Sequence, residues 1–330
     1  MVPSNDTVHS AQSKSAKRVL LLTYPRTASN LLLKILSLKN QPDVVSNEKG
    51  GYFFMDAFAK ERKTVCTRRP TKQWTVEETE EIRQAYQENF DYFEAKSQSA
   101  NSQGKIFFAK EHSPPLADPA ALTQYLLNHD YQMAPQPGIQ ILNSSSRLGI
   151  QVPNSYGAVR TFSPKNITIF QDAYIEKWTL TFSDTTSGPS IPILLSGTAE
   201  LGSYPGRQDG ICFPILLDAQ DVIHHPEVVL KYCELIGMNP EKVKFAWQPE
   251  NSPHFTTGVG PKCAEAVMTA TLDRSMSLLK EKTPATVDIA SERKKWEEEF
   301  GEGLVKQMKK WVEDAMPDYN YLRTKRLRVN

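Results

Sequence analysis

The sequence predicts an α/β fold, a three-layer sandwich in which helices cover both faces of a mostly parallel central sheet. Short β-favouring runs bounded by turn residues alternate along the chain with longer segments of helical periodicity. In addition, Arg18–Leu33 (RVLLLTYPRTASNLLL) has the pattern of a strand, a tight loop and the start of a helix. We assign residues 18–330 to one domain and residues 1–17 to a disordered leader.

The individual elements follow from these patterns. Strands are predicted at Val19–Leu22, Val44–Val45, Lys105–Ala109, Thr179–Phe182 and Ile211–Leu217. Helices are predicted at Leu31–Leu38, Trp74–Lys96, Pro119–Asn128, Asp172–Trp178, Pro226–Ile236, Lys262–Lys282 and Ser291–Ala315. Thr75 and Asp118 have residue types that favour helix N-termini, and Gly237 is expected to end a helix. Two segments of little pattern, His129–Asn166 and Ser183–Gly206, are predicted to be long loops.

Composition and charge exclude several classes of protein. The 39 Lys and Arg residues nearly cancel the 38 Asp and Glu residues, so a net charge of +1 gives no bulk attraction to nucleic acid or to an anionic membrane. No apolar run approaches the ~18 residues of a membrane span, and the N-terminus lacks the apolar core of a signal peptide. The scattered cysteines, without a C-x-x-C pair, argue against a zinc site and a disulfide framework. We therefore predict a cytoplasmic protein with no metal site and no nucleic-acid or membrane partner.

The loop after the first strand has the features of an anion site. It consists of Tyr24, Pro25, Arg26, Thr27, Ala28, Ser29, Asn30 and Leu31. Small residues allow a tight turn there, and the unpaired N–H groups and dipole of the following helix attract anions. The Arg26 guanidinium would add a charge-assisted contact, although the G-K-[ST] ending of a Walker A loop is absent. The alternative interpretation is an ordinary polar turn between a strand and a helix.

The segment TYPRTASNLL resembles the 5′-phosphosulfate loop of sulfotransferases, which typically reads T-Y-P-[KR]-S-G-T-[TN]-[WL]. In that family the basic residue at the position of Arg26 holds the 5′-phosphate and assists sulfuryl transfer. The resemblance implies that the residues from Tyr24 to Leu31 bind the cofactor, and it also implies a P-loop-like fold. Ala28 replaces the usual glycine, which restricts the backbone at one phosphate contact.

A second segment, KIFFAKEHSPP at Lys105–Pro115, resembles the family's strand followed by K-x-H-x-P. In sulfotransferases this histidine takes the proton of the acceptor hydroxyl, and imidazole suits the task because its ordinary pKa lies near neutral pH. The resemblance assigns His112 as the general base and Lys110 as its positively charged neighbour. A third segment, CFPILLDAQDVIHHPEVVLKYCELIGM, also resembles the family. Three others, ADPAALTQYLL, AWQPE and MPDYNYLRTKRLR, resemble its fungal-type branch, so that the likeness extends from about Arg18 to Arg328.

One element of the family pattern is missing. Sulfotransferases hold the cofactor's 3′-phosphate with R-x-P-x-x-x-x-x-S after a strand, whereas Ser183–Ser190 contains no arginine and retains only Ser190 as the serine end. Arg147 and Ser155 have the required separation, although they precede the strand that they should follow. The basic C-terminal tail RTKRLRV is a further candidate for the 3′-phosphate contact.

Two classes of function remain open. In the first, a sulfotransferase-like enzyme of secondary metabolism transfers a sulfuryl group from 3′-phosphoadenosine 5′-phosphosulfate (PAPS) to a hydroxyl of a small organic molecule, and Arg26 and Lys110 stabilise the charge on the transferring group. In the second, the scaffold does not use this cofactor. His112 then catalyses an elimination, isomerisation or cyclisation in small-molecule biosynthesis, or the protein binds a small molecule without catalysis. The phosphate loop favours the first class and the missing arginine favours the second.

Overall fold

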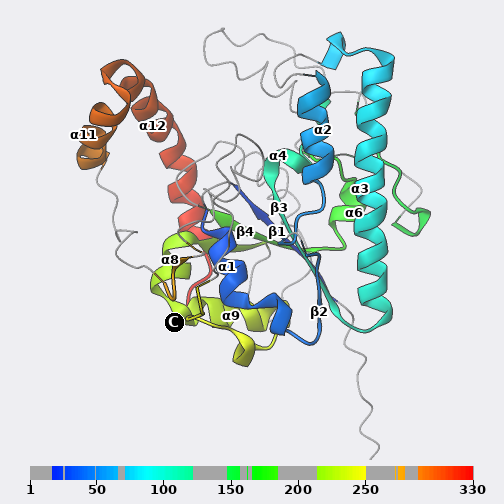
Figure 1. Ribbon diagram of the computed structural model, residues 1–330, viewed down its shortest axis with the longest axis horizontal. Helices are drawn as coiled ribbons and strands as arrows, with labels where there is room; N and C mark the ends of the chain where they lie inside the picture. The colour runs from blue at the N-terminus through cyan, green and yellow to red at the C-terminus, as the bar shows by residue number, and fades with distance from the viewer. Residues whose placement is uncertain are drawn as a thin grey trace, which may run out of the picture.

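The computed structural model describes residues 17–24, 27–48, 50–65, 71–121, 147–156, 162, 166–184, 214–249, 272, 274–278 and 289–329. Its centre is a five-stranded sheet in the order β2-β3-β1-β4-β5, in which all the pairings are parallel (Figure 1). The strands are β1 (Arg18–Thr23), β2 (Val44–Val45), β3 (Ile106–His112), β4 (Thr179–Asp184) and β5 (Ile215–Asp218). The predicted parallel α/β architecture is therefore confirmed.

Helices cover both faces of the sheet, as Figure 1 shows. The described α-helices are α1 (Ser29–Leu36), α2 (Met55–Val65), α3 (Val76–Ser102), α4 (Ser113–Leu116), α6 (Asp172–Ile175), α8 (Ala219–His224), α9 (Pro226–Ile236), α11 (Ile289–Phe300) and α12 (Glu302–Lys325). Alternate residues of β1 face opposite layers. Leu20 and Leu22 belong to a core shared with α2, α3 and α6, whereas Val19 and Leu21 pack with residues of α1, α8 and α9.

The aromatic side chains of α3 build the core on one face of the sheet. Tyr86, Phe90 and Phe93 are almost completely buried. The Phe93 ring stacks on Trp178 with 4.8 Å between the ring centroids, and it meets Phe107 of β3 edge-on at 5.3 Å. Tyr86, Phe90 and Phe93 therefore stabilise the fold as part of this core.

Several helix boundaries follow the capping signals in the sequence. Thr75 forms a capping box with Glu78 at the start of α3. The Asp118 carboxylate accepts hydrogen bonds from the backbone N–H groups of Ala120 and Ala121 at 3.0 and 3.1 Å. Gly237 follows α9 with a φ of 86°, in the left-handed region that favours glycine. These three predictions are confirmed.

Other predicted boundaries were wrong. The helix α2 was not predicted, because only Ala57 and Val65 among its residues are buried and its apolar periodicity is weak. The helix expected at Ser291–Ala315 is divided at Gly301, whose φ of 78° is not helical, and α12 continues to Lys325. The helix expected at Lys262–Lys282 falls mostly outside the described residues.

A buried charge network joins α3 to the amino end of β1. The Arg18 guanidinium donates two hydrogen bonds to the Glu94 carboxylate, at 3.3 and 3.2 Å. The hydroxyls of Tyr156 and Tyr174 donate to the same carboxylate at 2.6 and 2.7 Å. The guanidinium also lies 5.6 Å from the Trp178 ring. Because the Glu94 oxygens accept four hydrogen bonds from these three residues, the network stabilises the fold at the end of β1 opposite the predicted phosphate loop.

None of the described helices has the length and apolar character needed to cross a membrane. In the described part of the chain, no three His, Cys, Asp or Glu side chains are grouped so that they could hold a metal ion.

Candidate active site

The carboxyl ends of the three central strands meet beside the predicted phosphate loop. In the strand register, Thr23 at the end of β1 pairs with His112 of β3 on one side and with Ser183 of β4 on the other. Strands β2 and β3 lie on one side of β1, and the later strands β4 and β5 lie on its other side, so the strand order reverses at β1. Parallel sheets bind ligands at such a reversal of strand order, outside the carboxyl ends of the strands.

The described part of the loop is held by its own polar groups. Thr27 is buried, and both its N–H group and its hydroxyl donate to the Tyr24 carbonyl, at 3.3 and 2.8 Å. The Ser183 hydroxyl donates to the Thr27 carbonyl at 2.9 Å, which attaches the loop to β4. The helix α1 then begins at Ser29 with no side-chain cap and no acidic residue in its first turn. Its first N–H groups are therefore available to an anion.

Ala28 adopts a left-handed conformation, with φ 56° and ψ 15°. This conformation costs an L-residue about 1–2 kcal/mol, whereas glycine loses about 0.5–1 kcal/mol more conformational entropy than alanine on folding. We expect Ala28→Gly to raise the free energy of unfolding by up to about 1 kcal/mol, as measured by urea denaturation. Ala95→Gly, at an exposed position within α3, is the control and should lower it by about 1 kcal/mol. Destabilisation by both variants would contradict the inferred strain.

Lys110 is a buried cation next to the start of α1. Its side chain is fully buried, and the ammonium donates a hydrogen bond to the Asn30 amide oxygen. It also lies 4.3 Å from the centre of the Tyr52 ring. Burial lowers the pKa of Lys110 to about 7, and the adjacent Glu111 opposes this shift. Because no described carboxylate forms an ion pair with it, an anion bound beside α1 would supply its missing counter-charge.

Both ring nitrogens of His112 are hydrogen-bonded. Nδ1 lies 2.7 Å from the Thr23 hydroxyl, and Nε2 lies 2.7 Å from the Tyr52 hydroxyl. The Thr23 hydroxyl donates its proton to the Glu111 carbonyl at 3.2 Å, so it accepts a hydrogen bond from Nδ1–H. This assignment leaves Nε2 as the acceptor for Tyr52. Burial, together with the charge of Lys110, lowers the pKa of His112 to about 4, so that the imidazole is neutral at pH 7.

Glu111 lies between these two residues in β3, and its side chain faces the other layer. One carboxyl oxygen accepts hydrogen bonds from the backbone N–H groups of Phe53 and Phe54. Burial raises the pKa of Glu111 to about 8, because no full counter-charge replaces the lost water. Glu111 therefore attaches the segment before α2 to the sheet.

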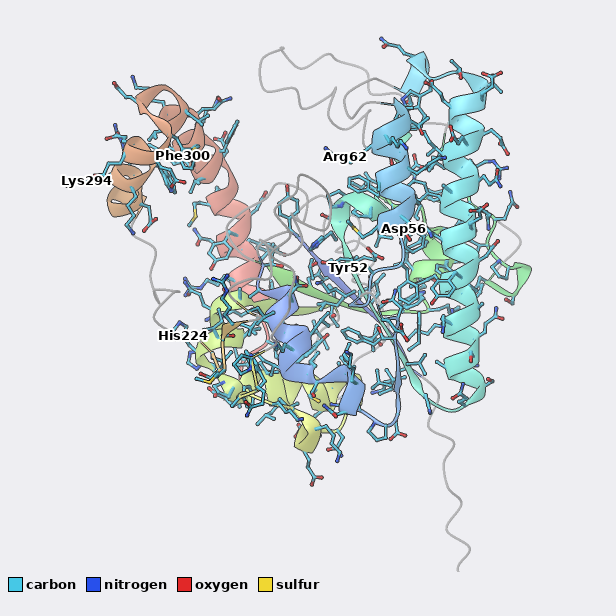
Figure 2. The ribbon with its side chains drawn as sticks, viewed as in Figure 1. Tyr52, Asp56, Arg62, His224, Lys294 and Phe300 are labelled. Carbon is cyan, nitrogen blue, oxygen red and sulfur yellow. The ribbon has the colours of Figure 1, made fainter. Side chains whose placement is uncertain are left out.

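Gly51 brings the same segment into close contact with β3. The Lys110 N–H group donates to the Gly51 carbonyl at 3.1 Å. A Cβ atom at Gly51 would lie 3.0 Å from the Lys110 Cβ and backbone nitrogen, and the φ of +90° also requires glycine. Tyr52, labelled in Figure 2, directly follows Gly51 and leads towards α2. This close approach positions the Tyr52 ring over Lys110.

Two curated relatives match almost the entire chain. Sulfotransferase ppzF of Metarhizium rileyi is 31% identical over 97% of this chain and 99% of its own length. Sulfotransferase ppzF of Metarhizium majus is 30% identical over 97% of this chain and 100% of its own length. The chain belongs to the sulfotransferase-like family. No protein-family model and no solved structure matches it.

The structure brings several of the residues predicted for this sulfotransferase-like site to one edge of the sheet. Lys110, His112 and Asn30 are linked there through the Tyr52 ring and the hydrogen bonds described above. Tyr24 and Leu31 are half-buried and Ser29 is buried. Pro25, Arg26 and Ser190 lie outside the described residues.

The alternative 3′-phosphate pair of this sulfotransferase-like chain has other contacts. The Arg147 guanidinium donates to the carbonyls of Asn166 and Thr168 and lies 4.1 Å from the centre of the Phe162 ring. Burial lowers the pKa of Arg147, and the nearby Asp118 opposes this shift. Ser155 is exposed. Arg147 thus stabilises the chain around Asn166–Phe170.

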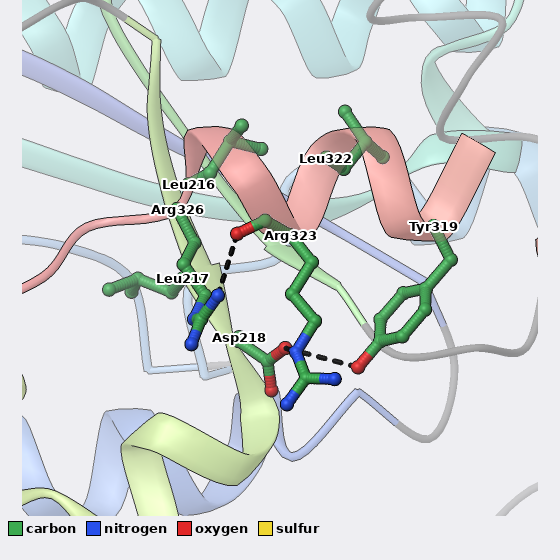
Figure 3. Close-up of a pocket in the computed structure, with 7 residues that line it drawn as sticks. All are labelled: Leu216, Leu217, Asp218, Tyr319, Leu322, Arg323 and Arg326. Atoms are coloured by element: carbon green, nitrogen blue, oxygen red, sulfur yellow. Dashed lines mark hydrogen bonds and ion pairs between the residues drawn. The ribbon is translucent and has the colours of Figure 1, made fainter. Parts of the chain in front are cut away.

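The basic C-terminal tail packs against β5 and has acidic partners. Figure 3 shows residues that line a shallow hollow, open to solvent, at the carboxyl end of this strand. In it, Arg323 lies 3.9 Å from the Asp218 carboxylate, and the Tyr319 hydroxyl donates to that carboxylate at 3.1 Å. The Arg326 guanidinium donates to Asp221 at 2.7 Å. Asp218 and Asp221 therefore pair with two of the four cationic side chains of the tail.

Sequence reasoning missed Thr23 and Tyr52 as partners of the histidine. Thr23 is the last residue of β1, and its role depends on the register between β1 and β3. Tyr52 is 60 residues from His112 in the chain. The Gly50-Gly51 pair before Tyr52 was the available signal, because adjacent glycines indicate a turn or a close backbone approach.

Proposed function

We propose that the chain transfers a sulfuryl group from PAPS to a hydroxyl group of a small organic molecule. The main support is that the buried Lys110 cation and the neutral His112 imidazole lie at the same sheet edge, next to the uncapped start of α1. A cation and free helix N–H groups suit an anionic donor. A neutral imidazole suits proton removal from an alcohol or phenol.

The chain offers three kinds of contact to the donor. When bound, PAPS supplies a sulfuryl group activated by its bond to a phosphate. The N–H groups of Ser29, Asn30 and Leu31 would bind the 5′-phosphate at the start of α1. The Lys110 ammonium, oriented by Asn30, would neutralise charge on the 5′-phosphate and on the transferring group, and the family resemblance adds Arg26 to this set.

His112 is the proposed general base. Thr23 and the Glu111 carbonyl orient the ring, so that Nδ1 keeps its proton and the Nε2 lone pair faces the Tyr52 hydroxyl. The proton released by the acceptor hydroxyl ends on Nε2 as the acceptor oxygen bonds to sulfur. Because partial burial and the charge of Lys110 lower its pKa, the imidazole is neutral and ready to accept this proton across the physiological pH range.

Donor binding is tested with 3′-phosphoadenosine 5′-phosphate (PAP), the desulfated product. PAP should raise the thermal unfolding midpoint of the protein in a concentration-dependent way. Lys110→Met should weaken PAP binding by about tenfold or more, because it removes a buried charge-assisted contact. Lys105→Met, just before the opposite end of β3, is the matched control and should bind PAP like the wild type.

The pH dependence of PAP affinity provides an additional check. The PAP phosphate is dianionic above about pH 6.5, and Lys110 has a pKa of about 7 in the free protein. Affinity should therefore fall as the pH rises above 7, by at most about tenfold per pH unit, and Lys110→Met should remove this dependence. No thermal shift at millimolar PAP would overturn the proposal and favour a scaffold that does not use the cofactor.

A further inference from the structure

We propose that Tyr52 is a catalytic proton relay, whose hydroxyl passes the acceptor's proton to His112. This inference rests on the proposed sulfuryl transfer and adds a residue to its site. It starts from the hydrogen bond between the Tyr52 hydroxyl and His112 Nε2, at 2.7 Å. A neutral imidazole has one lone pair, so the acceptor hydroxyl and Tyr52 cannot both donate to it.

The tyrosine is held firmly in this position from both sides. The Asn47 side chain accepts a hydrogen bond from the Gly51 N–H group at 2.8 Å and donates one to the Tyr52 carbonyl. On the other side, the N–H groups of Phe53 and Phe54 donate to Glu111. Displacement of Tyr52 by each acceptor would require this backbone to move or the ring to leave its rotamer, whereas a relay needs no movement.

The ring itself has two further contacts. Its centre lies 4.3 Å from the Lys110 ammonium and 5.0 Å from the centre of the His112 ring. A cation over the ring face is attracted to it and fixes its orientation. The same charge would stabilise partial negative charge on the phenol oxygen while its proton is in transit. Tyr52 is half-buried rather than enclosed, and the relay requires that the acceptor reach its hydroxyl.

In the proposed relay, both proton transfers and the sulfuryl transfer occur in a single concerted step. The acceptor hydroxyl donates its proton to the Tyr52 oxygen, as the Tyr52 proton moves to His112 Nε2. The acceptor oxygen forms its bond to sulfur, and the bond between sulfur and the 5′-phosphate oxygen breaks, with its electron pair leaving on the phosphate. Tyr52 ends the step as a neutral phenol, and the imidazolium later releases its proton to solvent.

The test compares Tyr52→Phe with His112→Gln and with the control Tyr321→Phe, which changes an exposed tyrosine of α12. The readout is PAP release from PAPS with benzyl alcohol, with 4-nitrophenol, or with water as the only hydroxyl. Tyr52→Phe should lower kcat for benzyl alcohol and water by about 10²–10⁴-fold. At pH 8 it should change kcat for 4-nitrophenol only a few-fold, because this phenol is largely ionised at that pH. Tyr321→Phe should change neither.

A second readout does not depend on turnover. In ¹⁵N-histidine spectra, the His112 signals are identified by their loss in His112→Gln. The wild type should show a protonated Nδ1 and a hydrogen-bonded Nε2. Tyr52→Phe should shift Nε2 towards the value of a free lone pair and leave Nδ1 protonated.

The outcomes separate the two proposals. The relay would be overturned if Tyr52→Phe kept or increased turnover, or if it lost the same factor with every acceptor. It would also be overturned if Nε2 of His112 carried the proton in the wild type. Failure of the wild type to bind PAP would overturn the proposed function itself, because Tyr52 has no part in that measurement.

Discussion

Replacing His112 with glutamine is expected to lower kcat for PAPS-dependent sulfation of benzyl alcohol by about 10²–10⁴-fold. Glutamine fills a similar volume but cannot accept the proton of the acceptor hydroxyl. PAP should still stabilise the variant, because its proposed contacts come from α1 and Lys110. His225→Gln is the control, since this exposed histidine lies between α8 and α9, away from the sheet edge. If His112→Gln kept the turnover of the wild type, His112 would not be the general base.

The pH profile gives the same prediction a second check. The base must be neutral, and burial together with Lys110 lowers the pKa of His112 to about 4. Activity should therefore be lost only as the pH falls through about 4, whereas an unperturbed histidine would lose it near pH 6.5. Measuring kcat at saturating PAPS from pH 4.5 to 8 would detect the difference, provided that circular dichroism shows the protein folded throughout. An acidic limb of kcat near pH 6.5 would contradict the neutral state inferred for the His112 imidazole.

The second large effect concerns stability. Glu94→Gln is expected to lower the free energy of unfolding by about 3–5 kcal/mol, because it leaves Arg18, whose side chain is only 14% exposed, without its counter-charge. It also replaces an acceptor oxygen with a donor that faces the hydroxyls of Tyr156 and Tyr174. Burial and the adjacent Glu94 carboxylate raise the pKa of Tyr156 to about 12, so the phenol remains a donor at pH 7. Urea denaturation measures the difference.

A matched control comes from the same helix. Glu80→Gln makes the same chemical change at an exposed site, where Glu80 pairs with Arg83 three residues further along α3. Exposed pairs of this kind contribute little, so we expect no clear change in the urea midpoint. Similar behaviour of the two variants would mean that burial of the Arg18–Glu94 pair has no special effect on stability.

The parallel α/β architecture could be predicted because apolar runs and turn residues specify it locally. Val19–Leu22 and Ile211–Leu217 are apolar enough to indicate buried strands without knowledge of their neighbours, although the second strand begins at Ile215. The end of β3 shows where this reasoning fails. The strand was predicted to end at Ala109, yet it continues to His112, because Lys110 and Glu111 are buried through partners from Asn30 and Phe53–Phe54 that a local pattern does not reveal.

In the predicted site, too, some residues could be found from the sequence and others only from the tertiary structure. The family resemblance identified Lys110 and His112, and the structure brings both to the edge where β1 ends. It also gives Arg147, considered for the 3′-phosphate, carbonyl and aromatic partners within the fold. Tyr52 could not be found from local pattern, because its contact with His112 depends on Asn47, Gly51 and Glu111 holding its segment against β3.

By itself, the sequence determined the parallel α/β architecture, the capping of α3 and the motifs that indicated a sulfotransferase-like chain, because these depend on neighbouring residues. Tertiary structure alone decided the state of the side chains at the sheet edge. Strand register aligns Thr23 with His112 and thereby selects the tautomer. Burial, which no linear pattern measures, makes the imidazole neutral and brings the Lys110 pKa close to neutral pH.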